Sequence, residues 1–90
     1  MKPKNYMEEA VFNMLDEVLQ KMDICTCEKC INDIVAIALN NLPPKYIATE
    51  TGELYSKVNT LIRQFRVDII AAITKAAGIV KRNPRHGENK

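Results

Sequence analysis

Residues 58–80 read VNTLIRQFRVDIIAAITKAAGIV, and their apolar positions recur at intervals of three and four residues. This spacing is the period of an amphipathic α-helix. We therefore expect the longest helix of the chain to begin at about Val58 and to end where Asn83 and Pro84 stop it. The polar residues 84–90 beyond it, and residues 1–5 at the other end, are expected to be flexible. The apolar positions of the helix are Leu61, Ile62, Phe65, Ile69, Ile73, Ala76, Ala77 and Val80.

The long helix carries apolar residues on more than one stripe, because Ile69, Ile70 and Ile73 are apolar as well as Leu61 and Phe65. One stripe can pack inside the domain, and the other can pack against a second copy of the chain. A two-fold homodimer is the simplest arrangement that covers both stripes. A monomer whose long helix crosses the whole domain is the alternative.

Two shorter amphipathic helices are expected upstream, over residues 6–22 and from Ile31 to the segment NNLPP at 40–44. The prolines end the second helix because they restrict the preceding residue and lack an amide donor. The segment KYIATETGELYSK, residues 45–57, has no clear period and is predicted to be a loop. Its Gly52 suggests a turn followed either by a short extended piece or by entry into the next helix. The sequence thus predicts an all-α fold of three or more helices with little or no sheet.

The composition fits one small domain over residues 1–90, because a chain of this length cannot divide its core. Hydrophobic residues make up 47% of the chain and aromatic residues 6%, which favours an aliphatic core that a metal or second subunit would support. The last third, residues 61–90, carries seven basic and two acidic residues and would attract an anionic partner. Without a membrane span or secretion signal in the sequence, we expect a cytoplasmic protein.

All the cysteines of the chain lie in CTCEKC, residues 25–30, at Cys25, Cys27 and Cys30. Thiolates at this spacing can converge on one zinc ion, which prefers four tetrahedral ligands. The N-terminus of the following helix and Lys29 are expected to stabilise the thiolates. A redox sensor and unmetallated core cysteines are the alternative interpretations.

The fourth zinc ligand must come from elsewhere, and His86 is the candidate because it is the only histidine of the chain. A solvated histidine in the tail is the alternative, with Asp23, Asp33 or a water as other ligands. No carboxylate or second histidine is placed by the sequence to act as a general base. We therefore expect a structural zinc and no enzymatic activity, with no catalytic residues.

The stretch CTCEKCINDIVAIALNNLPPKYIATETGELYSKV, residues 25–58, resembles the core signature of the late competence development ComFB family. The similarity continues weakly through the long helix to NPRH at 83–86. It implies a small, non-enzymatic helical homodimer with zinc held by cysteines. Some relatives take a fourth thiolate directly after a proline–arginine pair; here His86 follows Pro84 and Arg85.

The resemblance also implies a receptor for the second messenger cyclic di-GMP. Its phosphates need cations, and its guanines need flat or guanidinium surfaces. Asp68 and Gln64 can hydrogen-bond a guanine edge, whereas a rigid LPPKY corner and a solvated edge at Tyr55 and Lys57 are the alternative to a ligand site. The candidate ligand-binding residues are Lys45, Tyr46, Thr49, Tyr55 and Lys57 in the predicted loop, and Arg63 and Arg66 on the long helix.

Three functions follow from these observations. The first is a dimeric signalling protein that binds cyclic di-GMP and reports to an unidentified protein partner. The second is a zinc-stabilised adaptor in competence and DNA uptake, for which we expect no direct nucleic-acid binding because that requires several phosphate contacts. The third is a thiol redox sensor.

Overall fold

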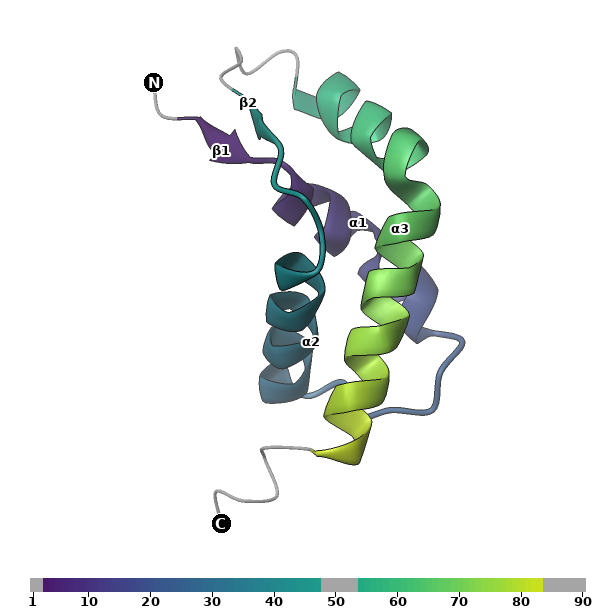
Figure 1. Ribbon diagram of the computed structural model, residues 1–90. Coiled ribbons are helices and arrows are strands. Elements are labelled where there is room, and N and C mark those ends of the chain that lie inside the picture. The colour runs from purple at the N-terminus through teal and green to yellow at the C-terminus, as the bar shows by residue number, and fades with distance from the viewer. Residues whose placement is uncertain (1–2, 48–53, 84–90) are drawn as a thin grey trace.

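The computed structural model describes residues 3–47 and 54–83, and within these ranges the side chains of residues 47 and 54–56 are not described. Three helices dominate it (Figure 1), which confirms the all-α prediction. A short antiparallel pair of two-residue strands is the sheet of the described part. In chain order the elements are β1 (Lys4–Asn5), α1 (Met7–Leu19), α2 (Glu28–Asn40), β2 (Tyr46–Ile47) and α3 (Leu54–Arg82).

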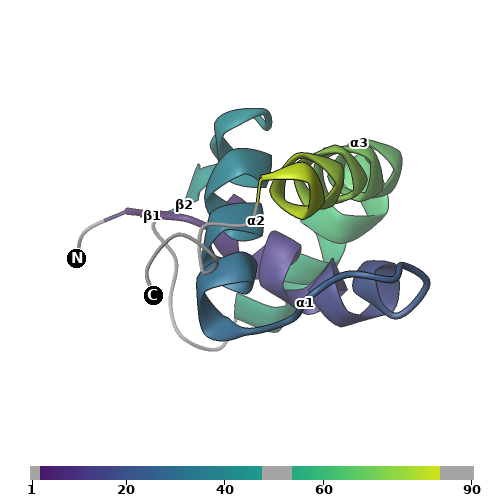
Figure 2. The ribbon, with the colours of Figure 1, turned by 90° about the horizontal axis from the view of Figure 1, so that it is seen from below.

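Helix α3 packs against both α1 and α2, and the three helices surround a common core when seen from below (Figure 2). The predicted apolar stripe of α3 faces this core, because Leu61, Ile69, Ile73 and Val80 are buried. Met7 and Val11 of α1 and Ile34 of α2 are fully inaccessible to solvent at the same centre. Each such side chain contributes about 1.5–3 kcal/mol when it is taken out of water.

The segment predicted as a loop over residues 45–57 contains parts of two regular elements, which corrects that prediction. Tyr46 and Ile47 form β2, and the last four residues, Leu54 to Lys57, belong to α3. Leu54 lies one helical turn before Val58 and continues the apolar spacing, so the helix extends further than its clearest part suggests.

The N-terminal segment is tied to the corner that follows α2. Asn5 pairs with Tyr46 and Lys4 with Ile47. The Asn5 side-chain oxygen accepts hydrogen bonds from the backbone N–H groups of Met7, at 3.1 Å, and Lys45, at 2.8 Å. Lys4 and Asn5 therefore belong to the folded domain and not to the flexible end expected over residues 1–5.

Helix α3 is kinked at Phe65, whose φ of −116° and ψ of 22° are not helical. Sharp kinks usually occur at proline, at glycine or serine pairs, or at π-bulges. Residues 61–69 contain no proline, glycine or serine, so tertiary packing explains the bend better. Beside the kink, Lys45 Nζ lies 4.9 Å from the centre of the Phe65 ring, and Arg66 forms an ion pair with Glu17 of α1.

None of the described helices combines the length and the apolar character that crossing a membrane would require. The two-fold homodimer stays a prediction. Several apolar side chains of α3 outside the fully buried face are already partly covered within one chain. Ile62, Phe65 and Ile70 are half-buried against the core. Val67 on the same helix is 78% exposed.

The burial of Ile73 makes it a direct test of the α3 packing. Replacing Ile73 with Ala should lower the free energy of unfolding by about 2–5 kcal/mol, because the removed methyl groups leave a cavity in the core. The exposed neighbour Thr74 is the matched control, and Thr74→Ala should change it by no more than about 0.5 kcal/mol. Urea denaturation followed by circular dichroism measures both values, and equal effects of the two substitutions would contradict this packing.

Candidate functional site

The three cysteines converge at the N-terminus of α2, as the sequence predicts. Cys27 is the N-cap residue, with extended φ and ψ of −68° and 165°, and its carbonyl accepts the first helical hydrogen bond from Ile31 N–H. Cys30 lies in the first helical turn, and Cys25 lies in the loop before it. The sulfur atoms of all three lie within 4.8 Å of one another.

This cluster has the shape of an open metal-binding site. Sulfurs bound tetrahedrally to zinc at 2.3 Å lie about 3.8 Å apart, so small side-chain rotations are enough to bring these three onto one ion. Cys25 and Cys27 are exposed, which gives an ion access from solvent, and Cys30 closes the inner side at 2% exposure. Three thiol groups together can therefore hold a soft divalent metal ion.

Burial dominates the electrostatics of the inner thiol. Burial, together with smaller contributions from hydrogen bonding with the Cys27 and Cys25 side chains, raises the pKa of the Cys30 thiol to about 12. The expected stabilisation of the thiolates by the helix N-terminus and Lys29 is therefore wrong for Cys30. Its pKa lies above the ordinary thiol value, so this proton is held at neutral pH until a cation displaces it.

The end of α3 and the first turns of α2 border one groove. Asn83 and Asp33 line the same groove of about 350 Å³ between α2 and α3. Asp33 follows Cys30 by three residues, which is less than one helical turn. Among the described residues, the converging group consists of the cysteines and includes neither Asp23 nor Asp33. The predicted ligand His86 lies outside the described residues.

The residues predicted to bind a ligand are distributed around the kink of α3. Lys45 is half-buried, with its ammonium over Phe65, whereas Tyr46 is 67% exposed. Lys57 and Arg63 are exposed on α3. Tyr55 lies in α3 and its side chain is not described, and Thr49 lies outside the described residues.

Arg66 is the predicted ligand residue with a described ion-pair partner. Its Nη2 atom donates to Oε2 of Glu17, and both side chains are about half exposed. Such surface ion pairs contribute about 0.2–1 kcal/mol. An incoming phosphate can therefore compete for Arg66 at small cost.

A groove of about 400 Å³ lies between the corner after α2 and the middle of α3. Asn41, Leu42 and Pro43 form one wall. The other wall is a single face of α3, with Asp68 and Lys75 at its two ends and Ala71 and Ala72 between them. The small alanine side chains leave room for a flat group between an acceptor and a cation.

Lys75 was absent from the residues predicted to bind a ligand. Its spacing of seven residues from Asp68 places both on one side of a helix, which is a signal present in the sequence. That signal could not be assigned to a site without knowing which face of α3 meets the LPP corner.

The cysteine cluster and the LPPKY corner lie at opposite ends of α2, as Figure 1 shows. The 13 residues of α2 span about 20 Å. Helix α3 runs in the opposite direction, so the corner faces the middle of α3 and the first turns of α2 face its C-terminal part. A metal ion and a small-molecule ligand at these places would not touch each other.

Comparisons with known proteins show the family of this chain and support its fold. The sequence profile of the family described as late competence development protein ComFB matches residues 4–84. The competence protein ComFB of Bacillus subtilis (strain 168) is 26% identical over 81 residues, which cover 89% of this chain and 83% of that protein. The solved structure of the late competence protein ComFB from Bacillus subtilis aligns with a TM-score of 0.78 and 25% identity, covering 91% of this chain and 93% of that one.

The cysteine geometry predicts metal binding that depends on pH. Because zinc must displace protons from the thiols, zinc occupancy of the purified chain should fall as the pH is lowered from 7 towards 5. Cys27→Ser and Cys30→Ser should lose the metal at pH 7 and lower the melting temperature. Thr26→Ala, in the same loop, is the control that should keep both.

Elemental analysis with thermal unfolding measures these effects. Native protein that folds without any metal and forms a reversible disulfide within residues 25–30 would contradict the zinc site and favour a redox sensor.

Proposed function

The chain belongs to the late competence development protein ComFB family, and we propose that it is a non-enzymatic cytoplasmic signalling protein that binds cyclic di-GMP. A structural zinc ion would stabilise the loop between α1 and α2. The observation that carries the proposal is the groove between the Leu42–Pro43 corner and α3, because Asp68 and Lys75 line it together and offer a hydrogen-bond acceptor and a cation.

The groove and its surroundings supply the chemical groups that the nucleotide needs. The Asp68 carboxylate can accept hydrogen bonds from the donor edge of a guanine, and Lys75 can neutralise a phosphate at the other end of the groove. Tyr46 offers an exposed ring on which a base can stack. Further cations near the kink of α3 come from Lys45, Lys57, Arg63 and Arg66. We propose that Thr49 and Tyr55 complete the group of ligand-binding residues.

A two-fold homodimer suits this ligand, because cyclic di-GMP carries two guanines and two phosphates. Two copies of the site related by a two-fold axis would present matching groups to both halves of the nucleotide. The exposed Val67 and the half-buried Ile70, one turn apart on α3, form an apolar strip that a second copy can cover.

We propose a structural zinc site completed by His86. Asn83 lines the same groove as Asp33, which follows Cys30 by less than one helical turn, and the three residues from Asn83 to His86 can span up to about 10 Å. An imidazole can therefore reach the open side of the cluster, where the two exposed cysteines lie. With three thiolates, it would give the tetrahedral Cys₃His set of structural zinc sites.

Replacing His86 tests the fourth ligand. His86→Ala should weaken zinc binding by more than about tenfold, because even second-shell partners of a metal site are worth about 10–100-fold. Asp33→Asn and Asp23→Asn are the controls and should leave zinc affinity within about twofold of the original. Competition with a chromophoric chelator measures all three, and a larger loss in either aspartate variant would transfer the ligand role to that residue.

Isothermal titration calorimetry with cyclic di-GMP tests the proposed ligand. Tyr46→Ala and Lys57→Ala should each weaken binding by about tenfold, a loss of about 1.4 kcal/mol, while zinc content stays unchanged. Lys29→Ala, an exposed lysine at the far end of α2, is the control for general loss of positive charge. The absence of heat at tens of micromolar protein, under zinc-loaded conditions, would contradict the proposal.

A zinc-stabilised adaptor in DNA uptake is the second candidate function. It is favoured by the Bacillus subtilis relative, which is named a competence protein. The described end of α3 adds Lys81 and Arg82, both exposed, to the basic last third of the chain. An electrophoretic shift assay at low salt separates a direct DNA-binding form, which we do not expect, from a role that bridges proteins only.

A further inference from the structure

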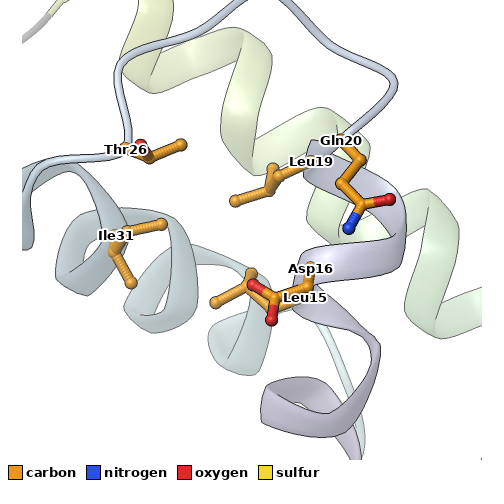
Figure 3. Close-up of a pocket in the computed structure, with 6 residues that line it drawn as sticks. All are labelled: Leu15, Asp16, Leu19, Gln20, Thr26 and Ile31. Atoms are coloured by element: carbon orange, nitrogen blue, oxygen red, sulfur yellow. The ribbon is translucent and has the colours of Figure 1, made fainter.

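A second groove opens between α1 and α2, away from the corner and beside the cysteine loop. It has a volume of about 410 Å³ and is lined by Leu15, Asp16, Leu19, Gln20, Thr26 and Ile31. Figure 3 shows Leu15 and Leu19 of α1 directed toward Ile31 of α2, with the Asp16 carboxylate and the Gln20 amide at one edge. The groove therefore has an apolar floor and a polar rim with an acidic group.

The stripe of α1 that borders this groove continues into an exposed aromatic residue. Phe12 precedes Leu15 by three residues and Asp16 by four, so the three lie on one side of the helix. Its side chain is 53% exposed, in contrast to Met14 and Leu15, which are buried. A large apolar side chain next to an apolar groove is the composition of an interaction surface.

The charged residues of α1 all have one sign. Helix α1 carries four carboxylates, Glu8, Glu9, Asp16 and Glu17, and no basic residue. Glu17 pairs with Arg66 on the side that faces α3. Glu8 and Asp16 are exposed and flank Phe12 by one helical turn on either side. Their potential attracts a positively charged partner to the groove.

We propose that Phe12 and the groove between α1 and α2 form a docking surface for a basic, amphipathic segment of a partner protein. The apolar side chains of that segment would contact Phe12 and enter the groove between Leu19 and Ile31. Its lysines or arginines would pair with Glu8 and Asp16 at the rim.

A second copy of this chain fits the surface poorly. A two-fold contact places the same patch on both sides of the interface, so the carboxylates of one α1 would oppose those of the other. Like charges held opposite one another across an interface destabilise it. The acidic surface therefore selects a different protein, and it leaves α3 free for the proposed homodimer.

This docking surface gives the protein partner of the proposed signalling function a defined place. It does not require nucleotide binding, because the groove lies along α1 and the proposed nucleotide groove lies between the corner and α3. Peptide binding measured without nucleotide and calorimetry with cyclic di-GMP can therefore fail separately.

The test uses the zinc-loaded, full-length chain labelled with ¹⁵N and a synthetic peptide in which leucines recur every three or four residues among lysines. Adding the peptide should shift the amide signals of Phe12, Asp16, Gln20, Thr26 and Ile31 most strongly. A peptide with glutamates in place of lysines, and one with serines in place of leucines, should bind at least about tenfold more weakly. Affinity for the original peptide should fall as salt is raised.

Matched variants locate the binding. Phe12→Ala should weaken binding of the lysine–leucine peptide by about tenfold or more. Asp16→Asn should also weaken binding of this peptide and should reduce the dependence of its affinity on salt. Val67→Ala, which removes another exposed apolar side chain, and Asp68→Asn, which removes an exposed carboxylate of α3, should leave affinity unchanged.

Three results from the variants and the signal shifts would overturn the proposal. They are signal shifts confined to α3, equal losses in the Phe12 and Val67 variants, and a change of oligomeric state in Phe12→Ala, which would assign the surface to self-association. The absence of peptide binding at millimolar concentration would overturn it as well.

Discussion

Helix α3 buries one apolar face against α1 and α2 at once, and this shared contact fixes the positions of the other elements. Ile69, Ile73, Ala76 and Ala77 lie at its centre and are almost inaccessible to solvent. The same helix then supplies a residue to each feature at its edges. Lys45 rests on Phe65, Glu17 pairs with Arg66, the corner after α2 faces Asp68, and Asn83 lines a groove with Asp33. A change in the direction of α3 would therefore alter all of these contacts together.

The molecule divides its polar chemistry between the two ends of α2. One end holds three sulfur atoms within 4.8 Å, in a loop whose outer residues are exposed. At the other end, two hydrogen bonds fasten the corner to the N-terminal segment: Lys45 N–H donates to the Asn5 side-chain oxygen, and Tyr6 N–H donates to the Lys45 carbonyl. A metal ion at the first end would add its binding free energy to folding, because the unfolded chain does not hold the three thiols together. The second end is ordered by backbone pairing and needs no ion.

The sequence was sufficient for the features that depend on local period and spacing. The three helices follow from apolar positions such as Met7, Ile34 and Ile73, and the convergence of the thiols follows from their place at a helix start. Helix α3 begins earlier than predicted because Gly52 obscures the pattern around Leu54. Such a break in the period does not tell where the chain returns to a helix.

Other features depend on which faces meet in three dimensions, and the sequence does not give that. The kink at Phe65 has no proline or glycine to announce it. Whether Phe12 is buried or exposed depends on the angle between α1 and α2, and Lys75 becomes a site residue only through the corner opposite it. The thiolate prediction failed for Cys30 for the same reason, because its burial depends on the packing of α2 on the rest of the chain.

The position of α3 in the chain has a consequence for biosynthesis. Ribosomes release the N-terminal part of a protein first, and the helix that completes this core is made after α1 and α2. The nascent chain therefore exposes the apolar faces of α1 and α2 until α3 has been synthesised. During that interval it is a substrate for chaperones, and a premature stop anywhere before Ile69 would yield a product that cannot close its interior.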